Sequence, residues 1–510
     1  MSGSIDFDFN NLFIFDLANN HQGDMAHAED IIRSVGKVVK AEGVRGGIKF
    51  QFRDLDTFIH PDHKEATTNK HIPRFLGTRL SPDDYRKLCG IVKECGMHTI
   101  CTPFDEASVD LIEELGIEII KIASCSAADR PLLTRIADSR KPIIASTAGL
   151  KTNEIDFLVN LFEARELPLA IMHCVAVYPS RNDQLRLNSI DILKNRYPNH
   201  KIGWSTHENQ DEILPIQIAV AKGARLFERH VGKPSEKYSL NAYSSTPEQL
   251  SAWIKGYKRA VEACGPSQRP PAFIEEIDSL NSLKRGVFAS RSLQKGEEIT
   301  RDAVFFAMPL QDQQLQSDHF HAGMVADQDY EPNAALGIQL FDPSASEHQT
   351  IIEILTQVRG LLNNAHIVIG EDSKIELSHH YGLERFREFG CLIIDCINRK
   401  YCKKLIVVLP RQKHPYHYHK RKEETFQLLY GDLEVEIDGE RTSPRVGQTI
   451  LVEKEKWHKF STLHGAIFEE VSTTHYNDDS FYEDERIALI PRAKRKTQLS
   501  DWRTAVSCNL

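Results

Sequence analysis

Side chains able to bind anions recur at the ends of short apolar runs in the first half of this chain. Lys49 and Lys121 supply positive charges. Hydroxyl groups come from Thr102, Ser124, Ser146 and Thr147. Ammonium and hydroxyl donors together suit a phosphate or a carboxylate better than a neutral ligand. The sequence therefore predicts an anion-binding pocket, provided that the fold brings these runs together.

Two histidines and two carboxylates occupy similar positions. His207 and His230 end apolar runs, and two imidazoles can hold a divalent metal whose shell is completed by substrate oxygens and water. Asp16 and Glu228 offer carboxylates for proton transfer. Taken singly, each residue is more often a surface charge, a turn residue or a structural histidine. Their common position at run ends is what favours a catalytic site.

The apolar runs themselves predict the fold. They cover residues 12–21, 47–51, 99–105, 119–124, 143–147, 169–174, 202–207 and 226–230. Stretches with helical periodicity lie between them, at 25–42, 106–115, 152–165, 211–223 and 246–263. Another helix is expected after Ser81, an N-cap serine followed by proline and two aspartates. This alternation indicates an α/β (β/α)₈ TIM barrel over residues 1–265, whose active site lies at the C-terminal strand ends.

The rest of the chain divides into two further predicted domains. A Pro- and Gly-rich linker at 265–271 precedes a small β-rich domain, placed at 280–345. A helix is expected at about 347–364. Short, regularly spaced strands then predict an all-β domain at 375–495, a β-barrel or double-sheet jelly roll.

The C-terminal domain carries its own candidate metal ligands. His417 and His419 are two residues apart and face the same side of a strand. Glu424 and His458 can reach that side from other strands. Three imidazoles and a carboxylate suit a divalent Mn, Fe, Ni, Co or Zn ion. The alternative is a set of surface histidines beside a basic loop.

Composition narrows the class of protein. The net charge of −9 argues against nucleic acid as the main partner. No segment reaches the length of a membrane span, and the acidic N-terminus lacks a signal sequence. The ten cysteines form no C-x-x-C pair, which is typical of reduced thiols. We therefore expect a cytoplasmic enzyme that contacts neither membranes nor nucleic acids.

The run-end motifs resemble those of the sialic acid (N-acetylneuraminate) synthase family. They read DLANNHQGD (16–24), KFQ (49–51), CTPFD (101–105), KIAS (121–124), STAG (146–149), HC-x₃-YP (173–179), GWSTH (203–207) and ERH (228–230). Residues 282–309 further resemble the antifreeze-like (SAF) domain of that family. The resemblance implies condensation of phosphoenolpyruvate with an N-acylated or related aldose, giving a nonulosonic acid and phosphate.

The resemblance also implies roles for individual residues. His207 and His230 match the ligands of Mn²⁺, and Asp16, Gln51 and Tyr178 match residues near the acceptor sugar. Residues at the positions that bind phosphoenolpyruvate are Lys49, Thr102, Lys121, Ser124, Ser146 and Ser205. A homodimer is expected, because the SAF domain of such enzymes covers the partner's barrel.

Departures from the family pattern gather on the acceptor side. Asp16 replaces a glutamate, Ala176 replaces an asparagine, and the segment after His230 lacks the usual GlyProAsp. Met308 stands where the SAF domain has an arginine that reaches the partner's site. We therefore expect an acceptor other than ordinary N-acetylmannosamine.

The spacing H-x-H-x₄-E-x₆-G followed by G-x₁₀-H resembles the two motifs of the cupin superfamily. Residues 469–487 further resemble sugar isomerases of the D-lyxose ketol-isomerase type. A metal could there polarise an open-chain sugar while Glu434, Glu436 or Glu469 moves a proton. A sugar-binding cupin without turnover is the competing interpretation.

Two other functions remain open for the barrel. Lys121 or Lys49 could form a Schiff base in an aldolase. The barrel and cupin could also form a non-catalytic, sugar-responsive scaffold.

Overall fold

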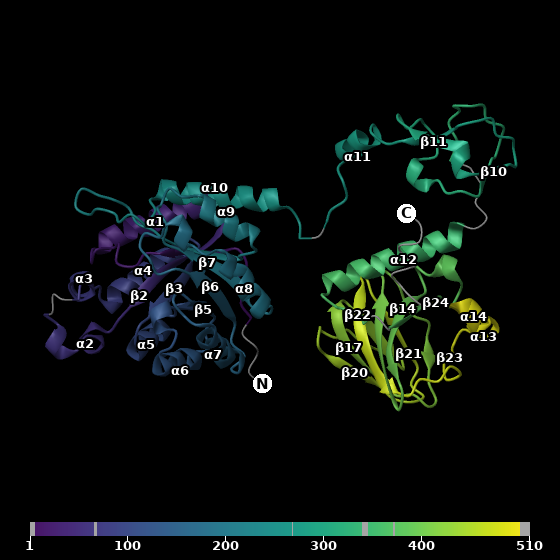
Figure 1. Cartoon of the computed structure of the whole chain (residues 1–510). Helices are drawn as coiled ribbons and strands as arrows, with labels where there is room; N and C mark the ends of the chain where they lie inside the picture. Colours follow the sequence, from purple (N-terminus) through teal and green to yellow (C-terminus); the bar gives the residue numbers. More distant parts are fainter. Residues whose placement is uncertain (1–5, 66–68, 268, 339–344, 371–372, 500–510) are drawn as a thin grey trace. The chain divides into compact units, whose positions relative to one another are not determined.

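The computed structural model describes residues 6–65, 69–267, 269–338, 345–370 and 373–499. The chain forms two compact units, Met1–Pro270 and Pro271–Leu510. The first unit contains a closed barrel of parallel strands surrounded by helices (Figure 1). The predicted TIM barrel is confirmed.

The eight barrel strands pair in chain order, and β8 closes the barrel against β1. Their bounds are β1 Leu12–Asp16, β2 Arg45–Phe52, β3 His98–Pro103, β4 Ile119–Ile122, β5 Ile143–Ser146, β6 Leu169–Cys174, β7 Lys201–Thr206 and β8 Leu226–His230. Nearly every strand residue is buried, as expected for a parallel sheet covered by helices.

Helices surround the barrel at all the predicted positions, and those at 55–58, 71–77, 130–138 and 188–196 were not predicted. In chain order, the helices are α1 Met25–Glu42, α2 Leu55–Phe58, α3 His71–Gly77, α4 Pro82–Glu94, α5 Glu106–Glu114, α6 Arg130–Asp138, α7 Thr152–Glu163, α8 Asn188–Arg196, α9 Leu214–Ala221 and α10 Pro247–Cys264. In α4, Ser81 and Asp84 form a reciprocal capping box. Leu88, Ile91 and Val92 of this helix are buried against the barrel, and the helix predicted after Ser81 is confirmed.

Strand alternation separates the barrel interior into an apolar layer and a polar layer. The apolar layer packs Leu12, Ile14, Ile100, Ile119, Ile144, Ala170, Met172 and Leu226 together. Because side chains two residues apart share a face, Ile14 is followed inside the barrel by Asp16, and Leu226 by Glu228. Likewise Lys121 follows Ile119. The polar side chains therefore lie at the C-terminal strand ends, above a closed apolar floor.

The second unit begins with α11 Ile274–Asn281 and a small β-rich region. Its strands β9 Gly286–Ala289, β10 Glu298–Ile299, β11 Val304–Ala307 and β12 Met324–Val325 form two two-stranded sheets. Val287, Leu293, Ile299 and Leu336 belong to one small apolar core.

A seven-stranded and a five-stranded antiparallel sheet follow α12 Ala345–Asn364. The larger contains β13 Lys374–Ser378, β14 Cys391–Asn398, β15 Tyr401–Val408, β17 Glu424–Gly431, β20 Thr449–Val452, β22 Ala466–Thr473 and β24 Lys496–Leu499. The smaller contains β16 His417–Tyr418, β18 Glu434–Ile437, β19 Glu440–Thr442, β21 His458–Ser461 and β23 Phe481–Tyr482. Short helices α13 Glu485–Leu489 and α14 Arg492–Arg495 precede β24.

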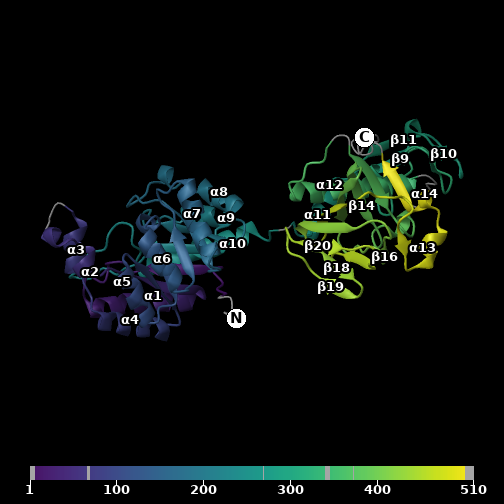
Figure 2. The same ribbon diagram turned by 90° about the horizontal axis from the view of Figure 1, so that it is seen from below.

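Helix α12 covers one face of the larger sheet. Ile354, Leu355 and Val358 pack with Leu377 and Val407 of that sheet. Strands β16 and β18 of the smaller sheet lie on the opposite side (Figure 2). The predicted all-β domain is confirmed. Among the residues that the structure describes, none of the helices has the length and apolar character needed to span a membrane.

Candidate functional site

The polar strand ends of the barrel enclose one pocket of about 800 Å³. Its lining includes most of the barrel residues for which a site role was predicted, namely Asp16, Lys49, Gln51, Thr102, Lys121, Ser124, Ser146, Tyr178, Ser205, His207 and His230. Glu228 also lines it. Thr147 does not, because its hydroxyl donates a hydrogen bond to the carbonyl of Met172, 3.0 Å away.

Glu228 is the centre of a buried charge network at the bottom of this pocket. Its two oxygens lie 2.5 Å from Nζ of Lys49 and 2.8 Å from Nζ of Lys121. Lys49 also lies 2.9 Å from Oδ2 of Asp16, and Lys121 donates to Oγ of Ser146 at 2.6 Å. Two carboxylates thus fix two ammonium groups at the end of the apolar floor.

Charge pairing decides the protonation of this network. Burial raises the pKa of the Glu228 carboxyl, but Lys121 and Lys49 outweigh burial and hold that pKa well below its usual range. The pKa of Asp16 is likewise lowered, because Lys49 and His230 outweigh its burial. Burial lowers the pKa of Lys49, yet Asp16 and Glu228 raise it overall. Lys49 is therefore an ammonium group at neutral pH.

His207 and His230 lie side by side, with ring centres 5.3 Å apart. Nδ1 of His207 donates to the carbonyl of Val175 at 2.8 Å, which leaves Nε2 free as a ligand atom. Burial, with His230 nearby, lowers the pKa of His207 to about 3, so its ring is neutral. The buried Nδ1 of His230 makes no hydrogen bond within the described structure and lies 3.4 Å from Oδ2 of Asp16. These donors fit a divalent metal.

The aromatic ring of Tyr178 packs beside this pair, 4.1 Å from the His207 ring between centres. Gln51 donates from Nε2 to Oδ2 of Asp16 at 3.2 Å. Tyr178, Gln51 and Asp16 therefore line the pocket next to the histidines.

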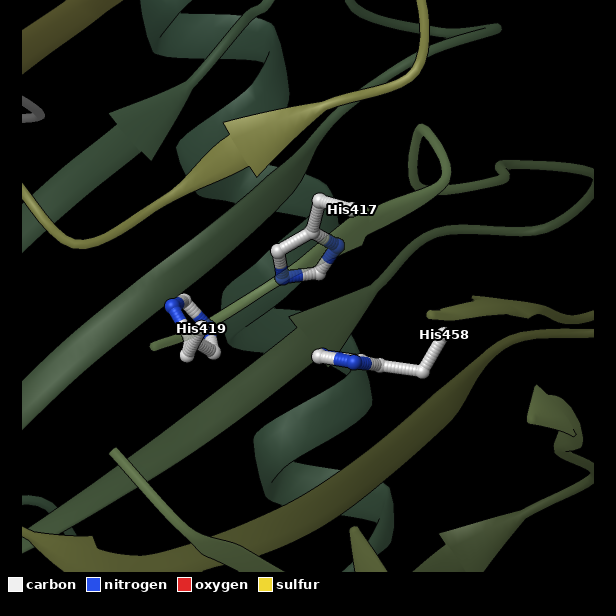
Figure 3. Close-up of side chains that lie close together, drawn as sticks. All are labelled: His417, His419 and His458. Carbon is white, nitrogen blue, oxygen red and sulfur yellow. The ribbon is translucent and has the colours of Figure 1, made fainter. Parts of the chain in front are cut away.

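The second unit brings together His417, His419 and His458, whose ligand nitrogens all lie within 4.8 Å of one another (Figure 3). Strands β16 and β21 place His417 directly opposite His458. Nδ1 of His417 and of His458 contact the carbonyls of Pro415 and Lys456, at 3.1 and 2.9 Å. Nδ1 of His419 contacts the carbonyl of Asp479. All three rings therefore present Nε2 to one another.

Glu424 completes this cluster from β17. Its Oε2 lies 3.0 Å from Nε2 of His458, and Oε1 lies 3.5 Å from Nε2 of His419. Neither Oε2 nor that His458 nitrogen has a hydrogen-bond partner within the described structure. Lys422 and the histidines outweigh burial and hold the pKa of Glu424 well below its usual range. These two atoms face each other without a hydrogen bond between them, and a cation bound to both would satisfy their lone pairs.

The carboxylates considered as bases in this region point away from the cluster. Glu436 pairs with Arg441 and Lys459, Glu469 pairs with Lys403, and Glu434 faces Arg441. None of them lines the cavity of about 60 Å³ beside the histidines, whereas Glu470 does. Glu470 lies 3.0 Å from Nζ of Lys422, which also contacts Glu424. Glu470 follows Glu469 on β22, and it faces the cavity because successive side chains of a strand point to opposite faces.

Comparison with known proteins identifies both regions. Residues 38–269 match the NeuB family, and residues 404–468 match the cupin domain. A crystal structure described as spore coat polysaccharide biosynthesis protein E of Chromobacterium violaceum is 44% identical, with a TM-score of 0.63. The match covers 65% of this chain and all of that one (100%). The chain belongs to the NeuB family.

Two other relatives of this NeuB-family chain are named as synthases. It is 28% identical to N-acetylneuraminate-9-phosphate synthase of Drosophila melanogaster, over 56% of this chain and 82% of the relative. It is 27% identical to N,N'-diacetyllegionaminic acid synthase of Campylobacter jejuni, over 56% of this chain and 86% of the relative. The predicted family is thereby confirmed.

Several residues of the NeuB-family pocket were not predicted. Arg53, Lys70, Arg74 and Tyr243 also line it. Arg53 could have been found from strand alternation, because it directly follows β2 and continues the every-second-residue pattern of Lys49 and Gln51. Lys70 and Arg74 come from the segment around α3, which carries no recognisable pattern in the sequence.

Proposed function

We propose that the barrel condenses phosphoenolpyruvate with an aldose to form a nonulosonic acid, with release of phosphate. The observation that carries this proposal is the meeting of two lysines, several hydroxyls and two neutral histidines in one pocket. The names of its relatives support the same reaction class.

The anionic groups of phosphoenolpyruvate have donors available in this pocket. Thr102 Oγ1 is buried and has no hydrogen-bond partner in the described part of the chain. Ser124 Oγ accepts from the amide of Ala148 at 2.9 Å, so its own proton is free to be donated. Lys121 and Ser146 lie beside them, with Ser205 on the neighbouring wall. An anion here would replace costly unmade hydrogen bonds with charge-assisted ones.

The chemistry assigned to the pocket forms one carbon–carbon bond. The methylene carbon of phosphoenolpyruvate attacks the aldehyde carbon of the open-chain sugar, water adds to the resulting oxocarbenium centre, and phosphate leaves by C–O cleavage. A divalent metal held by His207 and His230, which we propose to be Mn²⁺, supplies Lewis acidity for the aldehyde. Asp16, Gln51 and Tyr178 orient the acceptor, and the ionised Asp16 can accept a proton.

The pairing of the lysines speaks against a Schiff-base aldolase. A lysine attacks a carbonyl as a neutral amine. Lys49 is held as an ammonium group by Asp16 and Glu228, and Lys121 lies 2.8 Å from Glu228. Borohydride trapping of a carbonyl substrate would support the aldolase, whereas inhibition by EDTA supports the metal-dependent condensation.

The deciding experiment measures phosphate release from phosphoenolpyruvate with Mn²⁺ and a panel of aldoses. We expect release that depends on an aldose and is lost in His207→Ala. If no acceptor supports release, the condensation is wrong and the aldolase or the scaffold becomes the better explanation.

For the cupin domain, placed at 375–495, we propose a metal-dependent aldose–ketose isomerase. His417, His419, Glu424 and His458 would hold a Mn, Fe, Ni, Co or Zn ion, and Glu470 is the carboxylate in position to move the proton. The assay is interconversion of aldoses with ketoses by the metal-loaded protein. Sugar binding without interconversion would instead favour a binding domain.

We further propose that residues 280–345 form an atypical SAF domain and that the chain is a cytoplasmic homodimer. The small apolar core around Val287 and Leu336 supports an independent domain. Light scattering during size-exclusion chromatography tests the dimer, and a monomeric mass would contradict it.

A further inference from the structure

We propose that the acceptor sugar carries an anionic group at the end away from its aldehyde, bound by Arg53 with support from Lys70 and Arg74. This inference rests on the proposed condensation and narrows its substrate to a sugar phosphate or a sugar acid.

Arg53 directly follows β2 and continues the row of pocket-lining side chains formed by Lys49 and Gln51 of that strand. Lys49 lies deepest and contacts Asp16 and Glu228. Gln51 comes next and donates to Asp16. The guanidinium of Arg53 follows, with Nη2 donating to Oε1 of Gln51 at 3.3 Å. An acceptor lying along β2, with its aldehyde near the histidines, would therefore present its far end to Arg53.

The guanidinium of Arg53 is held in place without being neutralised. Its Cζ lies 4.0 Å from the ring centre of Phe75 and 3.6 Å from that of Phe104. Its buried Nε has no hydrogen-bond partner in the part of the chain described. Burial lowers the pKa of Arg53 to about 10, so the group is still charged at neutral pH. Such a planar, oriented fork suits bidentate binding of a phosphate or a carboxylate.

The net positive charge of the pocket favours a second anion besides phosphoenolpyruvate. Asp16 and Glu228 are the acidic residues of the described lining, and both are paired with lysines. Arg53, Lys70 and Arg74 therefore add three positive charges to the lining. Phosphoenolpyruvate brings about three negative charges, from one phosphate and one carboxylate, of which a divalent metal offsets two. Phosphoenolpyruvate alone would thus leave most of this positive charge without a partner.

Wild-type substrate preference gives the first test. Consumption of phosphoenolpyruvate is measured with N-acetylmannosamine and other aldoses, each as the neutral sugar, its 6-phosphate and its 6-carboxylate. We expect kcat/KM to be at least about tenfold higher for one charged form, because a charge-assisted contact is lost in the neutral sugar. The two charged forms distinguish a phosphate from a carboxylate ligand.

Arg53→Met gives the second test, because methionine can still pack between Phe75 and Phe104. We expect it to raise KM for the charged acceptor by about ten- to a hundredfold and to change KM for phosphoenolpyruvate less than about threefold. Arg53→Lys, which keeps the charge without the fork, should lie between. Arg165→Met is the matched control, since Arg165 pairs with Asp138 and does not line the pocket.

Three outcomes separate the possibilities. Equal or better catalysis with neutral aldoses would overturn this inference and leave the condensation intact. A rise in KM for phosphoenolpyruvate alone would assign Arg53 to that substrate instead, and would also overturn it. Absence of consumption with every acceptor would contradict the proposed function itself.

Discussion

Single residues in the barrel pocket contribute both to the stability of the fold and to the binding of anions. Glu228 forms ion pairs with both Lys49 and Lys121, so one carboxylate orients two ammonium groups in a buried place. An unpaired buried charge is far more costly than a surface one, since it cannot be solvated by water. The positions that prepare anion binding are therefore also positions on which stability depends.

Replacing Glu228 by glutamine should destabilise the barrel strongly. Two buried ammonium groups would lose their shared counter-ion, and we expect a loss of about 3–5 kcal/mol, measured as unfolding free energy in urea. Glu29→Gln is the control, because Glu29 forms a solvent-exposed pair with Arg33, and exposed pairs contribute little to stability. Equal losses in both variants would contradict the assigned network.

In the cupin domain, His458→Ala should remove a metal ligand. We expect the purified variant to contain one bound transition-metal ion per chain fewer than the wild type, as measured by inductively coupled plasma mass spectrometry. His464→Ala is the control, because His464 is exposed and pairs with Asp432. An unchanged metal content in His458→Ala would show that the three-histidine cluster is not a metal site.

At the scale of elements, the loop between β22 and β23 orients the cupin residue His419. The carboxylate of Asp479 accepts hydrogen bonds from the backbone amides of Lys420, Arg421 and Lys422, at 3.0–3.1 Å. The backbone carbonyl of the same residue contacts Nδ1 of His419. These contacts fix the segment between β16 and β17, which includes His419, to the loop that precedes β23.

Asp479→Asn should therefore weaken metal binding without removing a ligand. Its amide group would face backbone N–H donors, and we expect affinity to fall about ten- to a hundredfold, as is usual when a supporting contact of a metal ligand is lost. Competition with a chromophoric chelator measures this affinity. The adjacent Asp478→Asn is the control, since Asp478 pairs with the exposed Arg421; equal effects in both would argue against positioning by Asp479.

For the whole molecule, the two candidate sites belong to separate compact units. The barrel pocket lies within Met1–Pro270 and the histidine cluster within Pro271–Leu510. Each site takes all its described residues from its own unit, so neither needs the other to bind its ligands.

The effects of substitutions at the two sites should accordingly be additive. His458→Ala should leave consumption of phosphoenolpyruvate within about twofold of wild type, and His207→Ala should leave the cupin metal in place. The double variant should combine both losses and no more. A greater than tenfold loss of barrel activity in His458→Ala would reveal coupling between the units that the separate sites do not explain.

The sequence by itself determined the barrel, the cupin and most site residues. The alternation of apolar runs with amphipathic stretches is a local pattern that can be read from the sequence. Because the C-terminal strand ends of a parallel barrel lie together, the positions of Lys49, Lys121, His207 and His230 were predictable. Spacing likewise placed His417 and His419 on one face of a strand, whereas the pairing of β16 with β21 sets His458 opposite His417. Motif residues are found in this way because the fold class fixes where strand ends lie.

Only the tertiary structure decided which charges are paired and which remain available. The sharing of Glu228 by two lysines depends on distances across the barrel. Glu470 rather than Glu469 faces the cupin cavity, because a shift of one residue along a strand moves a side chain to the opposite face. Arg53 is left with unused donors because the packing of Phe75 and Phe104 encloses it. Pairing and burial are properties of three-dimensional neighbours, and local sequence patterns do not contain them.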